Sequence, residues 1–192
     1  MKVMSNKLAI IDIDGCLCEY PNPEFYQFIF GHTGERFSSL PIMKERLGED
    51  SYENLKDMYR ASGIKRNLVP LEKSVESLEL LKTMDFEILV LTSRPNVHNN
   101  FANTKFWLEK IGYPFDRLAF VDEKWRFFHE PPSGGMIVVD DNFFALEPYV
   151  NITNVMLFQF GNEPDPIGMQ ADNYYFGANW CDFIVSLKSY HE

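Results

Sequence analysis

The chain has 192 residues, which is enough for one domain of moderate size or for one core with a small insertion. Hydrophobic residues make up 45% of it and include 17 Phe and 9 Tyr, so a well-filled core is feasible. The net charge of −10 is opposite to the basic surfaces that grip long nucleic acids, and we expect no extended nucleic-acid binding. A small anionic substrate is compatible with this charge, because a bound divalent cation reverses the local field.

The three cysteines have no spacing typical of a disulfide framework, and we interpret them as free thiols in a reducing, cytoplasmic compartment. Cys16 and Cys18 lack a second Cys or His pair that would complete a zinc site. No apolar run approaches the roughly 20 residues that span a bilayer, so we expect neither a signal peptide nor a membrane partner.

Short, nearly continuous apolar runs predict strands that are covered on both faces, as in a parallel sheet. In chain order these runs are Leu8–Ile13, Glu87–Leu91, Leu118–Val121, Met136–Val139 and a weaker one at Asn154–Phe158. Helical spacing of apolar residues predicts helices at Leu71–Met84, Phe101–Ile111, Phe143–Tyr149 and Trp180–Tyr190. This alternation predicts an α/β fold, a three-layer Rossmann-like parallel sheet with right-handed crossovers.

Residues 19–70 interrupt the alternation of strands and helices. They contain no strand pattern and several prolines, although Glu53–Ser62 has helical character. A connection of about 50 residues is too long for an ordinary loop. We therefore predict a small helical cap inserted after the first strand, with residues 1–18 and 71–192 forming the core. Such an insertion either closes over the site and excludes water, or has no role in it.

The first strand ends in two carboxylates, Asp12 and Asp14, followed by Gly15. Neighbouring carboxylates repel each other, and their burial is costly unless a cation or a proton neutralises them. The pair therefore indicates a metal site, an acid/base pair, or both. The alternative is a strand that runs into a turn, because Asp-Gly is a common turn dipeptide.

Polar residues also follow the next two strands, at the sheet edge where ligands bind in open α/β folds. Thr92, Ser93 and Arg94 follow the second strand, and hydroxyl, N–H and guanidinium groups suit phosphate oxygens. A Ser/Thr turn that caps the next helix is the alternative. Lys124 follows the third strand, either as a solvated lysine or as a cation facing phosphate and carboxylate groups.

The fourth strand ends in Asp140 and Asp141, two more carboxylates at the same predicted edge. Together with Asp12 and Asp14 they form a set of hard oxygen ligands, which favours Mg²⁺ above other cations. A cation is expected where Asp12, Asp14 and Asp140 converge, because the cluster of negative charge would otherwise destabilise the fold.

In these motifs the sequence resembles the haloacid dehalogenase (HAD) superfamily of phosphohydrolases. The matching positions, in order, are Asp12-Ile13-Asp14-Gly15-Cys16-Leu17 for the first motif, Thr92 for the second, Lys124 for the third and Asp140-Asp141 for the fourth. The chain departs from the pattern at Cys16, where Thr or Val is usual. Arg117 and Arg126 compete with Lys124 for the third motif.

The resemblance implies the catalytic roles. Asp12 is the nucleophile and forms an aspartyl-phosphate. Asp14 protonates the leaving oxygen and then deprotonates the hydrolytic water. Mg²⁺ is held by Asp12, the backbone carbonyl of Asp14 and Asp140, with Asp141 as an outer or alternative ligand. The phosphate is bound by Thr92 and Lys124, with Ser93 and Arg94 as further contacts.

Within the superfamily the chain is similar to the 5′(3′)-deoxyribonucleotidases, which implies a nucleotide or a similar small phosphate ester as the substrate. It is also similar to the 3′-phosphatase domain of polynucleotide kinases, so a polynucleotide 3′-end is the second candidate. Haloalkanoic-acid dehalogenases need neither a second acid nor a metal, so Asp14 and the Asp140-Asp141 pair argue for phosphate. A non-enzymatic, receiver-like module that binds Mg²⁺ is a further alternative.

Two sets of residues in the insertion are candidates for substrate recognition. Its aromatic residues either stack on a base or form the core of the insertion, and they are Tyr20, Phe25, Tyr26, Phe28, Phe30 and Phe37. Its cationic residues either meet a second anionic group or form a solvated face, and they are Arg36, Lys44, Arg46, Arg60, Lys65 and Arg66.

Overall fold

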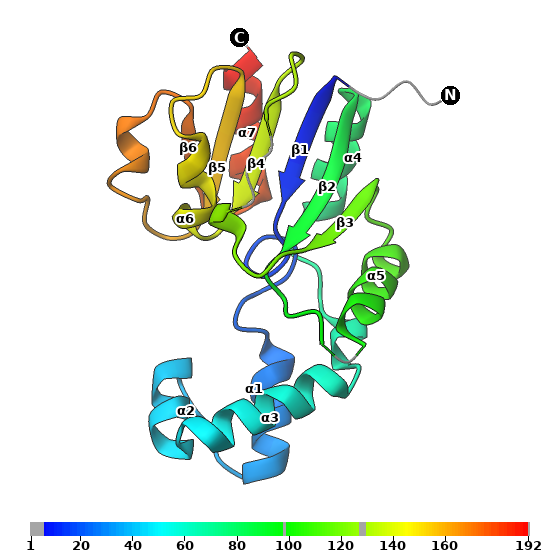
Figure 1. Cartoon of the computed structure of the whole chain (residues 1–192), viewed down its shortest axis with the longest axis vertical. Coiled ribbons are helices and arrows are strands. Elements are labelled where there is room, and N and C mark those ends of the chain that lie inside the picture. The colour runs from blue at the N-terminus through cyan, green and yellow to red at the C-terminus, as the bar shows by residue number, and fades with distance from the viewer. Residues whose placement is uncertain (1–5, 98, 127–129, 192) are drawn as a thin grey trace.

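A six-stranded, wholly parallel sheet with strand order β3-β2-β1-β4-β5-β6 forms the centre of the protein (Figure 1). The computed structural model describes residues 6–97, 99–126 and 130–191. The strands are β1 (Lys7–Ile11), β2 (Phe86–Thr92), β3 (Arg117–Phe120), β4 (Met136–Asp140), β5 (Val155–Phe160) and β6 (Tyr174–Gly177). The first five overlap the predicted runs, with bounds that differ by at most two residues, so the predicted parallel α/β sheet is confirmed.

Seven α-helices are found in the described residues. They are α1 (Pro23–Thr33), α2 (Leu40–Leu47), α3 (Glu49–Ala61), α4 (Ser74–Thr83), α5 (Asn100–Ile111), α6 (Phe143–Leu146) and α7 (Trp180–His191). Short 3₁₀ helices include η1 (Ile64–Asn67), η2 (Lys124–Arg126), η3 (Glu147–Tyr149) and η4 (Gly168–Gln170). The four helices predicted after residue 70 correspond to α4, α5, α6 with η3, and α7.

Successive residues of the strands alternate between two apolar cores, one on each face of the sheet. Ala9 and Ile11 of β1 belong to a cluster that includes residues of α4, α5 and α7. Leu8 and Ile10 belong to a second cluster, which α6 and η3 complete. Helices therefore cover both faces, which confirms the predicted three layers and explains why the strand runs are continuously apolar.

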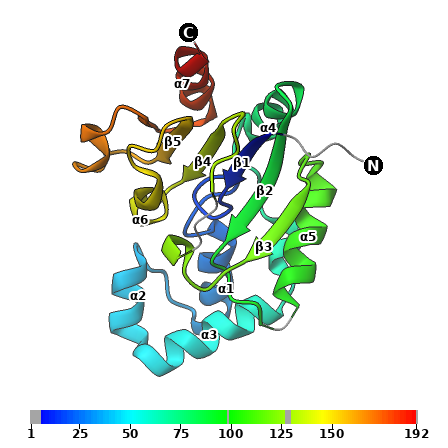
Figure 2. The ribbon, with the colours of Figure 1, turned by 45° about the horizontal axis from the view of Figure 1, so that its top comes forward.

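The inserted segment, residues 19–70, contains helices α1, α2 and α3 and the turn η1. It has an apolar cluster of its own, built from Phe25, Ile29, Met43, Tyr52 and Tyr59 with partly buried neighbours. Figures 1 and 2 show the three helices beyond the ends of β1 and β2, separate from the layers of the sheet. The exact division of the chain into core and cap stays a prediction.

Within the described ranges, none of the helices is both long enough and apolar enough to cross a membrane.

Candidate active site

The loop after β1 holds Asp12 and Asp14 at the edge of the sheet. The backbone N–H of Asp12 donates to the carbonyl of Val139 at 3.0 Å, so pairing with β4 continues to this residue. The carbonyl of Ile13 then accepts three backbone N–H groups, those of Cys16, Leu17 and Cys18, at 3.2, 2.8 and 3.1 Å. This tight turn fixes the backbone on both sides of Asp14.

Gly15 lies against Asp141, the residue that follows β4. Its φ is +89°, in the region that favours glycine. A Cβ atom placed there would lie 2.3 Å from the Asp141 Oδ2, which is shorter than any real contact. The residue after Asp14 must therefore be glycine for Asp141 to approach the first strand.

Lys124 joins the first and fourth strand ends. Its Nζ lies 2.6 Å from the Asp12 Oδ1 and 2.8 Å from the Asp140 Oδ2. The two carboxylates are each 5% exposed and the lysine side chain is 12% exposed, so the three groups form a buried ion network. Burial lowers the pKa of Lys124, but the two carboxylates outweigh burial and raise it, which keeps the ammonium protonated.

The two arginines that compete with Lys124 in the sequence lie elsewhere. Arg117 stands at the first residue of β3, at the opposite end from the strand ends that carry the carboxylates, and pairs with Glu87. Arg126 is 66% exposed and pairs with Glu123. Of these three cations, Lys124 is the one that contacts the carboxylate cluster.

Three carboxylates converge at this edge of the sheet. One oxygen from each of Asp12, Asp140 and Asp141 lies within 4.8 Å of the others. Burial raises the pKa of Asp12, and Asp140 raises it further. Burial and the charge of Asp12 raise the pKa of Asp141 to about 6. The raised pKa values mean that the fully ionised cluster is unfavourable without a cation. Its carboxylate oxygens are the donors that Mg²⁺ prefers.

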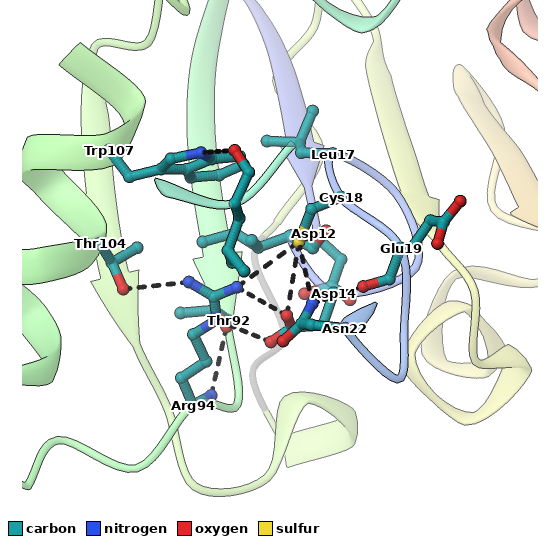
Figure 3. Close-up of polar contacts among 12 residues, drawn as sticks. Asp12, Asp14, Leu17, Cys18, Glu19, Asn22, Thr92, Arg94, Thr104 and Trp107 are labelled. Carbon is teal, nitrogen blue, oxygen red and sulfur yellow. Dashed lines mark hydrogen bonds and ion pairs between the residues drawn. The ribbon is translucent and has the colours of Figure 1, made fainter. Parts of the chain in front are cut away.

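The side chain of Asp14 lies outside this cluster and pairs with Arg94 (Figure 3). The Arg94 Nε donates to the Asp14 Oδ2 at 2.7 Å, and the Nη2 donates to the Oδ1 at 2.6 Å. The Nη1 donates to the Thr104 Oγ1 at 3.2 Å. Burial raises the pKa of Asp14, but the Arg94 guanidinium outweighs it and holds the pKa well below the usual range.

The predicted phosphate-binding residues after β2 lie in different environments. Thr92 is buried, and its Oγ1 accepts the backbone N–H of Arg94 at 3.2 Å, as expected of a turn. Ser93 is exposed. The guanidinium of Arg94 donates to Asp14 and Thr104, which favours a positioning role, and its predicted phosphate contact stays a prediction.

All eight residues predicted for the site line one cavity of about 550 Å³ between the sheet edge and the inserted segment. They are Asp12, Asp14, Thr92, Ser93, Arg94, Lys124, Asp140 and Asp141. Leu40 of α2 and Ala145 of α6 also line it, and Figure 2 shows these two helices facing each other. The topology thus brings together groups that are far apart in the sequence.

The inserted segment contributes an aromatic wall and three cations to this cavity. The aromatic wall consists of Tyr20, Phe25, Tyr52 and Tyr59, and the cations are Lys56, Arg60 and Lys65. Of the aromatic candidates from the sequence, Tyr20 and Phe25 line the cavity, whereas Tyr26, Phe28 and Phe37 pack against the apolar cluster of the segment. Phe30 is 40% exposed and lies outside the cavity lining.

Sequence reasoning missed Tyr52, Tyr59 and Lys56. The two tyrosines lie seven residues apart on α3, so they share one face of the helix. That spacing is the signal that would have found them. Of the cationic candidates, Arg60 and Lys65 line the cavity, whereas Arg36, Lys44, Arg46 and Arg66 do not.

No family model matches this chain, and no curated protein matches it. Solved structures do match its fold. One is a candidate β-phosphoglucomutase from Thermotoga maritima, with a TM-score of 0.62 and 16% identity over 95% of this chain and 99% of that one. Another is a HAD hydrolase of family IA, variant 3, from Entamoeba histolytica, with a TM-score of 0.55 and 15% identity over 92% and 94%.

A third match is a HAD-superfamily hydrolase of subfamily IA from Geobacter sulfurreducens, with a TM-score of 0.56 and 16% identity over 97% of this chain and 99% of that one. The fold is that of the HAD hydrolases. At such identities the likeness establishes the fold alone.

Proposed function

We propose that this protein is a Mg²⁺-dependent phosphomonoesterase that works through an aspartyl-phosphate on Asp12, with residues 19–70 as its cap. The observation that carries the proposal is the arrangement around Asp12. This buried carboxylate faces Lys124, stands in a cluster of metal-ligating oxygens, and opens into the same cavity as a second acid, Asp14.

In the first half of the reaction a carboxylate oxygen of Asp12 attacks the phosphorus, and the bond between the phosphorus and the ester oxygen breaks. Asp14 gives a proton to the departing oxygen. In the second half Asp14 takes a proton from a water molecule, whose oxygen attacks the phosphorus and releases Asp12 with inorganic phosphate. Two carboxylates are needed because one is covalently occupied while the other moves protons.

Lys124, Thr92 and Ser93 bind the phosphate oxygens in this proposal, and Lys124 also neutralises Asp12. Asp12, Asp140 and the backbone carbonyl of Asp14 would hold Mg²⁺, with Asp141 beside them. When bound, Mg²⁺ supplies positive charge that offsets the repulsion between the carboxylate and the phosphate. Charge stabilisation of this kind contributes most of the catalysis in phosphoryl transfer.

Arg94 positions Asp14 in this mechanism. Its two hydrogen bonds fix the orientation of the carboxylate and stabilise the ionised form, which is the form that takes a proton from water. Proton donation in the first half of the reaction has to overcome this stabilisation. An ester whose leaving group departs without a proton, such as p-nitrophenyl phosphate, is therefore a suitable first substrate.

The substrate we propose is a nucleotide or a similar small phosphate ester. Tyr20 supports this proposal, because it lines the cavity and is 59% exposed, and a tyrosine ring stacks on flat groups such as nucleobases. A cavity lined by both the sheet edge and the inserted segment also favours an enzyme over a receiver-like phosphoacceptor, which needs no pocket for a substrate.

Hydrolysis of p-nitrophenyl phosphate in the presence and absence of metal tests this function. We expect EDTA to reduce the rate to that of the uncatalysed background and Mg²⁺ to restore it, because the carboxylate cluster requires a cation to accept a phosphate dianion. Full activity in metal-free protein would contradict the role of the metal. A panel of nucleoside monophosphates, sugar phosphates and a 3′-phosphorylated oligonucleotide then separates the candidate substrates.

A further inference from the structure

Four charged side chains in the described part of the chain are buried: Asp12, Asp140, Arg94 and Lys65. Three of them have partners of opposite charge, since Asp12 and Asp140 contact Lys124 and Arg94 contacts Asp14. Lys65 is only 7% exposed and lines the cavity, and among the described residues its amino group has no hydrogen bond and no ion pair. Its amino group is not one of the enclosed polar atoms of the described residues, so it is accessible from the cavity. A largely buried lysine whose ammonium faces a cavity without a counterion is costly, so its retention needs an explanation.

Lys65 lies on η1, where the inserted segment returns to the core, and it lines the cavity. The charged groups that act on it most strongly are Arg94, Asp14 and Arg60. Burial and the repulsion from Arg94 lower the pKa of Lys65 to about 7. The attraction of Asp14 therefore does not compensate fully for these two effects on the charged form of Lys65.

The other cations of the inserted segment that line the cavity already have partners. Arg60 contacts Asp57 at 2.7 Å, and Lys56 contacts Glu53 at 3.2 Å. Lys65 therefore differs from both in its burial and in its lack of a counterion. An anionic group of a ligand can therefore pair with Lys65 without breaking an existing ion pair.

The position of Lys65 also indicates which part of a ligand it meets. Lys65 lies on η1 of the inserted segment, whereas Asp12 and Lys124, which face the transferred phosphoryl group, contact each other at the edge of the sheet. The charge of Lys65 also lowers the pKa of Asp14, the residue that handles the leaving oxygen in the proposed mechanism. A group bound by Lys65 would thus belong to the leaving part of the substrate.

We propose that Lys65 binds a second anionic group, a carboxylate or a phosphate, carried by the leaving part of the substrate. This inference rests on the proposed phosphatase function and narrows its substrate class to esters with two separate anionic groups. The aromatic wall then contacts the portion of the ligand between these groups.

Two matched pairs of substrates test the proposal. The first pair is 3-phosphoglycerate and glycerol 3-phosphate, in which a carboxylate replaces a hydroxymethyl group. The second is adenosine 3′,5′-bisphosphate and adenosine 5′-monophosphate. We expect the protein to prefer the more anionic member of at least one pair, by about 10- to 100-fold in kcat/KM, as for hydrogen bonds to charged groups. The pair that shows the preference identifies the anion.

The variants Lys65→Met and Lys65→Arg are then compared in the same pair. In Lys65→Met the ratio of the two kcat/KM values is expected to fall close to one. Lys65→Arg is expected to keep most of the preference for the more anionic substrate. Lys188→Met is the control, because Lys188 is an exposed lysine that does not line the cavity. It should leave the ratio unchanged.

A wild-type protein without preference in either pair would overturn the proposal, and so would a Lys65→Met variant that keeps the preference. Thermal unfolding without ligand gives an independent readout. Lys65→Met should melt at a higher temperature than the wild type, since it replaces a largely buried cation that has no counterion with an apolar side chain. A lower melting temperature would show that Lys65 serves the fold instead.

A binding measurement tests the anion site at Lys65 independently of phosphatase activity. If none of the esters is hydrolysed, the proposed function is wrong, but calorimetric binding of the same matched pairs still reports on Lys65. Tighter binding of the more anionic member that depends on Lys65 would support an anion site in the cavity. Equal binding of both members would exclude it.

Discussion

Asp12→Asn is expected to abolish phosphatase activity while it leaves the fold intact. The amide has nearly the shape of the carboxylate but cannot act as the nucleophile, so kcat/KM should fall by about 10⁴-fold or more. Stability should not fall, because the change removes a buried charge whose pKa is raised by burial and by Asp140. Lys124 keeps Asp140 as its partner. Hydrolysis of p-nitrophenyl phosphate and thermal unfolding measure the two effects.

Asp172→Asn is the matched control for this experiment. Asp172 is exposed and does not line the cavity, so the same chemical change should leave both activity and stability as they are. If Asp12→Asn folds and still turns over substrate at a rate close to that of the wild type, Asp12 is not the nucleophile.

Arg94→Met should destabilise the protein by about 3 kcal/mol, because it leaves the Asp14 carboxylate largely buried without its partner. The double variant Arg94→Met/Asp14→Asn should recover most of this loss, since no unpaired charge remains. Neither variant should be active. Urea unfolding of the wild type, both single variants and the double variant gives the coupling free energy between the two side chains.

The pH dependence of stability follows from the lowered pKa of Asp14. A carboxyl group whose pKa is lower in the folded state stabilises the protein above its ordinary pKa and loses this contribution as the pH falls through the lowered value. The contribution of Asp14 to the free energy of unfolding is thus complete at neutral pH.

A double variant that is no more stable than Arg94→Met would show that the ion pair between Arg94 and Asp14 does not contribute to stability.

The strands of the core were predictable because each one is buried on both faces, and its apolar run is visible in the sequence. Asp12 and Asp140 could be placed at one edge because parallel strands end on the same side of a sheet. Strand β6 was missed because Tyr174–Gly177 is short, lies at the edge and is only partly buried. Its pattern is too weak to separate from a loop.

The pairing of side chains was not predictable from the sequence. Arg94 and Asp14 lie 80 residues apart, and nothing in the Thr92-Ser93-Arg94 motif indicates that the guanidinium points to a carboxylate rather than a phosphate. Lys65 stands among several cations of the inserted segment, and only the folded chain distinguishes it by burial. Helices α1 and α2 were missed because prolines conceal their apolar spacing, although proline is well tolerated in a first turn.

The residue that carries the phosphoryl group during turnover decides whether Asp12 is the nucleophile. Protein mixed with p-nitrophenyl phosphate and Mg²⁺ is quenched in acid, digested and examined by mass spectrometry. We expect a phosphoryl group on Asp12 of the wild type and none on the Asp12→Asn variant. A phosphoryl group on another residue, or continued hydrolysis with no phosphorylated protein under conditions that trap an acyl phosphate, would contradict it.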